Sequence, residues 1–176
     1  MRSSAHLIII FSLFYMSAYC QTVSVTATGS AYVMRGVTVS TTGTNTLNYG
    51  DILATGSTQT RSISNANGQK FLATGTPGYY VHINYTPTVT LSNALWVAQY
   101  GGTTGTITFS SNPAPQHTLG NSNYVNPVTI TNGGSYLLTN SNGIGVIYIW
   151  VGGQISIIPN QPAGDYIGSF SITVSY

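Results

Sequence analysis

Residues 157–176 close the chain and read IIPNQPAGDYIGSFSITVSY. Pro159, Pro162 and Gly164 mark a turn, because proline fixes φ and glycine adopts conformations that other residues avoid. After the turn, polar and apolar residues alternate, with Ile167 as the one exception; the apolar side carries Tyr166, Gly168, Phe170, Ile172, Val174 and Tyr176. Period two places alternate side chains on opposite faces, which predicts a strand with one buried face. Because the sequence ends in this strand, we expect the strand's far neighbour to come from elsewhere.

The rest of the chain predicts an all-β fold. Short segments rich in Val, Ile, Thr and Tyr are separated by Gly, Asn and Pro turns, which is typical of an Ig-like antiparallel β-sandwich. We assign residues 32–176 to this domain, with a sandwich that lacks its last strand as the alternative form. The expected elements include strands at 32–40, 46–54 and 95–100, a hairpin turn at 65–68 and a loop at 110–126. Beyond the N-terminal segment, no window predicts an amphipathic helix.

Residues 1–20 have the form of a secretory signal peptide. Arg2 precedes an apolar run at residues 7–16, which is too short to cross a membrane. Cleavage after Cys20 would leave Gln21 as the new terminus. The alternative is lipidation of Cys20, although Tyr19 is larger than the residue that usually precedes a lipidated cysteine. We therefore expect a protein that passes through the periplasm and is secreted or held at the cell surface.

Charged residues make up 3% of the chain, against about a quarter in typical soluble domains. This scarcity excludes electrostatic nucleic-acid binding, which requires clustered Lys and Arg. It also leaves little for acid–base catalysis, since beyond the signal the candidates are Asp51, Asp165, His82 and His117. Two histidines without a third ligand do not predict a zinc site. We expect no enzyme activity, no cofactor and no metal.

The C-terminal stretch resembles a bacterial family called domain of unknown function 4402, which is similar to spore coat U proteins and archaic chaperone–usher pilin subunits. An earlier element, LNYGDI at residues 47–52, resembles the family's pattern L-x-F/Y-G-x-I. Archaic pilins commonly carry a disulfide, whereas this chain has no cysteine after residue 20. The matching C-terminal residues are Asn160, Gln161, Pro162, Ala163, Gly164, Tyr166, Gly168, Phe170, Ile172, Thr173, Val174 and Tyr176.

The resemblance implies a filament subunit that assembles with like subunits by donor-strand complementation, with help from a periplasmic chaperone and usher. The donor must be an extended peptide with apolar residues at every second position. Residues 21–31 meet this requirement and form a candidate N-terminal extension, with Val23, Val25, Ala27, Gly29 and Ala31 on one side. The expected acceptor groove is lined by Phe170, Ile172, Val174 and Tyr176. Alternatively, residues 21–31 are simply part of the domain's own first strand.

Two other functions fit the sequence. The first is a monomeric cell-surface or matrix module for binding and adhesion, in which Tyr79, Tyr80 and Trp96 are candidate glycan contacts. The second is a small outer-membrane β-barrel, because a C-terminal aromatic strand is also typical of that class. Barrel strands alternate over roughly ten residues, whereas the runs here are shorter and are interrupted by prolines.

Overall fold

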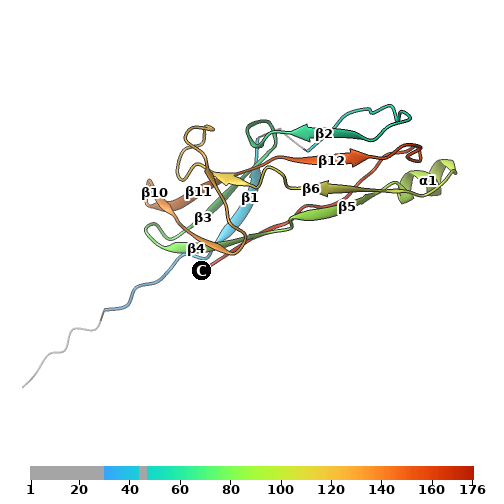
Figure 1. Cartoon of the computed structure of the whole chain (residues 1–176). Helices are drawn as coiled ribbons and strands as arrows, with labels where there is room; N and C mark the ends of the chain where they lie inside the picture. The colour runs from blue at the N-terminus through green and yellow to red at the C-terminus, as the bar shows by residue number, and fades with distance from the viewer. Residues whose placement is uncertain (1–29, 44–46) are drawn as a thin grey trace, which may run out of the picture. The chain divides into compact units, whose positions relative to one another are not determined.

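The computed structural model describes residues 30–43 and 47–176 (Figure 1). Residues 33–176 form one compact unit. Of the preceding unit, residues 1–32, only Ser30, Ala31 and Tyr32 are described; they are exposed and form no strand or helix. Of the expected donor residues, Val23, Val25, Ala27 and Gly29 therefore lie outside the described residues.

The compact unit consists of three antiparallel sheets, which confirms the predicted all-β sandwich. Sheet A has the order β1 (Thr38–Thr42), β3 (Gln69–Gly75), β11 (Ile144–Val151), β7 (Gln116–His117) and β8 (Val128–Thr129), and β10 (Thr139–Ser141) also pairs with β11. Sheet B has the order β2 (Gln59–Ile63), β12 (Gly153–Ile157), β6 (Thr106–Ser110) and β5 (Thr88–Ser92). Sheet C has the order β13 (Ile172–Ser175), β4 (Tyr80–Tyr85) and β9 (Gly134–Leu137).

The apolar side chains form two cores. The first core joins sheets A and C and contains Ala73, Val81, Ile83, Ile130, Leu138, Ile147, Ile149 and Val151, all fully or almost fully buried. The second core lies on sheet B and contains Ile107, Phe109, Ile155 and Ile157. Leu47 and Phe170 pack against both cores. The sandwich is therefore closed by a second sheet over the first core and by irregular segments over the second.

The chain passes between sheets A and B at one tightly packed point. Here a 3-10 turn, η1 (Asn65–Asn67), connects β2 of sheet B to β3 of sheet A. The hairpin turn predicted at this position is thus wrong, because the two strands do not pair. The buried Asn65 amide accepts a hydrogen bond from the Gly152 N–H at 2.6 Å and donates to the Ala114 carbonyl at 2.8 Å. At Gly152 a Cβ would lie 2.3 Å from the Ile63 carbonyl oxygen, so only glycine fits.

The strand predicted at residues 95–100 is wrong. These residues belong to a short helix, α1 (Ala94–Tyr100), within the run of Leu, Trp and Val that was taken for a strand. The Ser92 hydroxyl accepts a hydrogen bond from the Ala94 N–H, and Gly101 ends the helix with φ of 79°. Serine or asparagine before a helix and glycine after it are the usual boundary signals, but seven residues are too few to show a helical period.

Several other segments also differ from the expected secondary structure. The first strand begins at Thr38 rather than residue 32, and residues 47–54 form no strand, with Gly50 in the left-handed region at φ of 68°. The loop expected at 110–126 contains β7, in which His117 is buried. Burial lowers the pKa of His117, and its ring lies edge-on to that of Tyr136. Within the described residues, no helix has the length and apolarity needed to span a bilayer.

The predicted alternation in the C-terminal stretch is confirmed. Asp165, Ile167, Ser169, Ser171, Thr173 and Ser175 are exposed, whereas most of the intervening side chains are half-buried. The stretch is not one continuous ladder, however. Ile167 bridges to Ser92 of β5, and Ile172–Ser175 pair with β4. The final residues therefore run antiparallel to β5 and then to β4, along both cores in turn.

Candidate binding groove

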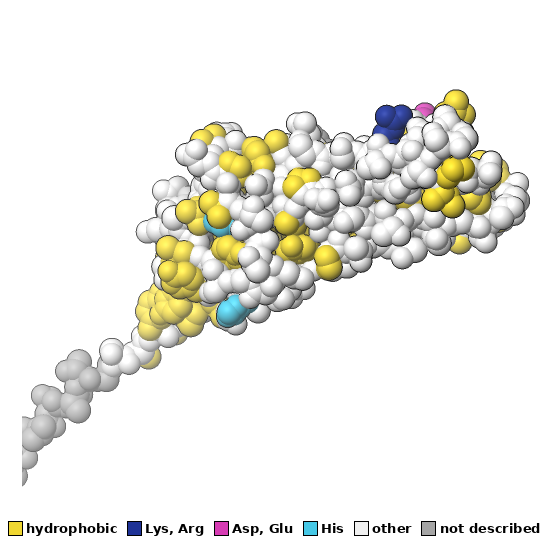
Figure 2. All heavy atoms as spheres, viewed as in Figure 1, with side chains coloured by type: hydrophobic (Ala, Val, Ile, Leu, Met, Phe, Trp, Pro, Cys, Tyr) yellow, Lys and Arg dark blue, Asp and Glu magenta, His cyan; other side chains and the backbone are white. Residues whose placement is uncertain are grey.

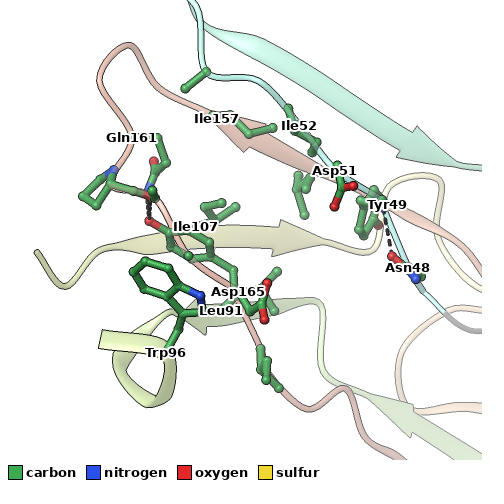
Figure 3. A pocket seen from close by; sticks show the side chains of 18 of the residues that line it. Asn48, Tyr49, Asp51, Ile52, Leu91, Trp96, Ile107, Ile157, Gln161 and Asp165 are labelled. Atoms are coloured by element: carbon green, nitrogen blue, oxygen red, sulfur yellow. Dashed lines mark hydrogen bonds between the residues drawn. The ribbon is translucent and has the colours of Figure 1, made fainter. Parts of the chain in front are cut away.

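A groove with a volume of about 1170 Å³ lies over the second core. Its walls are two irregular segments that are far apart in sequence, residues 47–54 and residues 161–168. The apolar side chains of its floor come from β5, β6 and β12 and include Leu91, Ile107, Ile155 and Ile157. Figure 3 shows Ile107 between the two walls, with Tyr49 and Ile52 on one side and Trp96 and Asp165 on the other.

The 161–168 wall has one backbone edge paired and one free. The N–H and C=O of Ile167 both bond to Ser92 of β5, each at 3.0 Å. In an extended chain, successive residues direct these groups to opposite sides. The groups of Tyr166 and Gly168 therefore point away from β5, and neither residue makes a backbone hydrogen bond within the described part of the chain. This wall resembles the edge strand of a sheet that lacks its next member.

The 47–54 wall is held by side chains. Across the described residues, no backbone–backbone hydrogen bond joins this segment to any other. The Gly50 N–H donates to the Asn48 side chain at 2.8 Å, and the Gln59 amide donates to the Leu53 carbonyl at 2.7 Å. Leu47, Tyr49 and Ile52 anchor the segment to the second core. Two backbone segments with unpaired polar groups thus flank an apolar floor.

The inner end of the groove is a smaller hollow of about 100 Å³, lined by Leu47, Tyr49, Val89, Leu91, Phe109, Gly168 and Phe170. The Tyr49 hydroxyl is buried there without a hydrogen-bond partner. Burial raises the pKa of Tyr49 to about 12. A buried hydroxyl without a protein partner costs free energy. Beyond Phe170 the chain enters β13, which lies against β1, so no further strand fits between these two.

The outer end of the groove is built around α1. The buried Asn93, just before the helix, donates to the Ala163 carbonyl at 2.9 Å and accepts from the Gly105 N–H at 2.7 Å. Gly164 has φ of 133°, and a Cβ there would lie 2.9 Å from the Trp96 ring, so glycine lets the wall approach the helix. The Tyr166 hydroxyl donates to the Pro162 carbonyl at 2.6 Å. The turn that the sequence singled out is therefore fixed firmly against α1.

Both acidic residues of the chain line this groove. Asp51 lies on one wall and Asp165 on the other, and both side chains are exposed (Figure 3). The surrounding surface carries few charges, as Figure 2 shows for one face. In the part of the chain that the structure describes, no three His, Cys, Asp or Glu side chains gather as metal ligands. The groove offers apolar contact, open backbone groups and two carboxylates at its rim.

The structure separates the residues expected to form the acceptor. Phe170 lines the inner hollow, whereas Ile172 and Val174 pack against the first core. The Tyr176 hydroxyl donates to the Arg35 carbonyl at 2.9 Å and accepts from the Thr76 N–H at 2.6 Å. Ala31 is exposed. The sequence analysis missed Leu91, Ile107 and Ile155 as groove residues, because only the fold brings their strands under the two walls.

The three candidate glycan-contact aromatics do not form one surface. Trp96 lines the groove and its ring lies 5.3 Å from that of Tyr100. Tyr80 begins β4, and the ring of the preceding Tyr79 lies 6.3 Å from that of Tyr176. Figure 1 places β4 beside the C-terminus and α1 at the opposite end of the sheets. A single ligand site therefore does not contain all three.

Comparison with protein families matches residues 34–176 to the domain of unknown function DUF4402. Comparisons with curated proteins and with solved structures give no match. The matched range covers the whole of the sandwich and both walls of the groove. The chain therefore belongs to the DUF4402 family.

Proposed function

We propose that this protein is a structural subunit of a secreted surface filament, similar to spore coat U proteins and archaic chaperone–usher pilins, and that it assembles by donor-strand exchange. The N-terminal segment of one copy, residues 21–31, fills the groove of the next. The observation that carries the proposal is the groove itself, in which two segments with unpaired backbone groups flank an apolar floor. A strand inserted between them satisfies these groups, as in other cases of β-strand addition.

The pattern of the donor segment matches the groove. Val23, Val25 and Ala27 face one side, and Ser24, Thr26 and Thr28 face the other. The apolar side covers Leu91, Ile107 and Ile155, while the hydroxyl side faces solvent near the two rim carboxylates. Val23 enters the inner hollow beside Phe170 and Tyr49. The acceptor thus combines Phe170 from the expected set with residues of the 47–54 wall and the floor.

The matching length also supports the proposal. Nine residues of extended chain span about 30 Å, at about 3.3 Å per residue. The wall from residue 162 to residue 170 contains the same number of residues as the donor from 23 to 31. The donor segment is therefore long enough to cover the groove from the inner hollow to α1.

The test uses a synthetic peptide of residues 21–31 and the chain lacking residues 21–29. We expect the peptide to bind the truncated chain and raise its melting temperature, and the mature chain to form polymers that the truncated chain does not form. Size-exclusion chromatography and negative-stain microscopy report the polymers. A peptide with Val23/Ser24 and Val25/Thr26 exchanged is the matched control, because it has the same composition with the apolar side inverted. Equal binding of the two peptides, or a stable monomer in both chains, would refute the proposal.

A monomeric binding module is the second candidate. The observation that favours it is the placement of Trp96, Asp51 and Asp165 around the same groove. Aromatic rings and carboxylates together are suited to sugar hydroxyl and ring contacts. Glycan-array binding that is lost in Trp96→Ala, from a protein that stays monomeric at high concentration, would select this function over the filament.

A further inference from the structure

Two apolar side chains of α1, one near its start and one at its end, are exposed to solvent. Leu95 is 74% exposed and Tyr100 is 65% exposed. Figure 2 shows hydrophobic side chains gathered at the end of the molecule that Figure 1 assigns to α1. Scattered apolar residues are normal on a surface, but a group of them at one end indicates contact with another molecule.

A second apolar group lies where the compact unit begins. Val33 is 86% exposed and Met34 is 41% exposed. The next residue, Arg35, is fixed by the Tyr176 hydroxyl on its carbonyl and by its own N–H, which donates to the Thr76 hydroxyl at 2.7 Å. The start of the unit is therefore held beside the C-terminus, at the end of the sheets opposite α1 (Figure 1).

The groove gives the inserted strand a direction. Its inner end is closed beyond Phe170, where β1 lies against β13, and its outer end lies beside Trp96 of α1 and Pro162. A donor segment is joined at its C-terminal end to an entire domain, which cannot pass through the blocked end. Accepting the proposed function, the donor must therefore leave the groove at α1. Residues 23–31 fill the groove, so only Tyr32 separates the end of the groove from Val33.

We infer that α1 of one copy docks the start of the compact unit of the next copy. Leu95 and Tyr100 of the first copy contact Val33 and Met34 of the second. Both groups are apolar, both are exposed in the single chain, and the covalent connection to the donor segment brings them together. The contact is heterologous, so each added copy exposes a new α1 for the next one. It makes the filament joint stiffer than a strand on a flexible linker would be.

Cysteine crosslinking tests this contact. Cys20 is the one cysteine of the sequence, so in the chain of residues 21–176 introduced thiols are the only ones. In polymers of this mature chain, we expect Val33→Cys with Leu95→Cys to give a ladder of disulfide-linked copies under mild oxidation. Val33→Cys with Val125→Cys is the matched control, because Val125 is also apolar and 51% exposed but lies in the loop before β8. We expect no ladder from the control pair.

Binding of the 21–31 peptide tests the proposed function, whereas the crosslink tests the α1 contact. Peptide binding without a Val33–Leu95 crosslink would overturn the α1 contact and keep the donor strand. Absence of both peptide binding and crosslinking would overturn both. As a second measurement, Leu95→Ser should leave peptide binding unchanged and raise the critical concentration for polymer formation by about tenfold. Unchanged polymer formation in this variant would also overturn the contact.

Discussion

The two cores of this sandwich differ in how they are covered. Over the first core, sheets A and C both contribute regular strands, and Ile147, Ile149 and Val151 of β11 are completely buried. Over the second core, sheet B is regular, but the facing layer consists of two irregular segments with a groove between them. One region is covered by paired strands, and the other by segments that make few backbone hydrogen bonds among the described residues.

This difference shows that a segment can have the apolar residues of a buried strand without forming backbone hydrogen bonds to a neighbouring strand. Residues 47–54 have the apolar residues to pack on the second core, yet among the described residues no backbone–backbone hydrogen bond joins them to another segment. In the first region the same kind of residue alternation in β13 is completed by β4. The second region therefore has the side chains of a finished sandwich without the backbone partners.

The largest expected difference between the regions is in the response to cavity formation. Ile149→Ala in the first core should lower the free energy of unfolding by about 3–5 kcal/mol, because the surrounding sheets cannot close the cavity. Ile155→Ala in the second core should cost about 2 kcal/mol, because the irregular walls can relax toward it. Urea unfolding followed by tryptophan fluorescence measures both. Equal losses would show that the two regions are equally rigid; Ile144→Ala, on the exposed end of β11, is the control.

Two buried asparagines allow the effect of each region on stability to be distinguished from its effect on peptide binding. Asn65 holds the passage between sheets A and B, and Asn93 holds the groove wall through the Ala163 carbonyl. Each makes three hydrogen bonds and is almost fully buried, so alanine should cost about 2–3 kcal/mol in either place.

Only Asn93→Ala should also weaken binding of the 21–31 peptide, because only Asn93 positions the groove. Calorimetric titration of the peptide into both variants measures this. The proposed groove is wrong if the two variants bind the peptide equally well. Asn93→Asp is a further control, since it keeps the acceptor for Gly105 and removes the donor to Ala163.

The sequence predicted the all-β class and the buried face of the last strand, because the alternation of polar and apolar residues is visible within a single strand, whatever its neighbours are. It did not predict α1, where seven residues between Asn93 and Gly101 give no visible helical period. It also did not predict the groove. Phe170 and Tyr49 were within the singled-out motifs, but Leu91, Ile107 and Ile155 come from three other strands. These residues lie together only because of the order of the strands in sheet B, and local sequence patterns do not reveal that order.

A smaller effect is expected where the first region is closed at its C-terminal end. Tyr176→Phe removes the hydroxyl that joins Thr76 and Arg35, and should cost about 1 kcal/mol of unfolding free energy. The loss should appear equally in the full chain and in the chain lacking residues 21–29, because this contact lies outside the groove. Thermal unfolding of both chains checks it. A loss confined to the full chain would instead connect Tyr176 to the N-terminal segment.

The smallest effect at neutral pH is expected from Tyr49, in the inner hollow of the second region. Tyr49→Phe removes a buried hydroxyl without a partner, so the free energy of unfolding should stay unchanged or rise by up to about 1 kcal/mol. At alkaline pH the difference should grow. The folded state raises the pKa of Tyr49 from 10 to about 12, so between these values the unfolded chain binds fewer protons and the native protein loses stability as pH rises.

The Phe variant lacks this titration and should lose less stability across the same pH range, which urea unfolding at several pH values measures. Tyr80→Phe, at an exposed position on β4, is the control and should follow the unmodified protein. If the donor strand supplies a partner for the Tyr49 hydroxyl, the advantage of phenylalanine at neutral pH should vanish when the 21–31 peptide is bound. An advantage that persists in the complex would mean that the inserted strand leaves the hollow unfilled, and would place Val23 elsewhere in the groove.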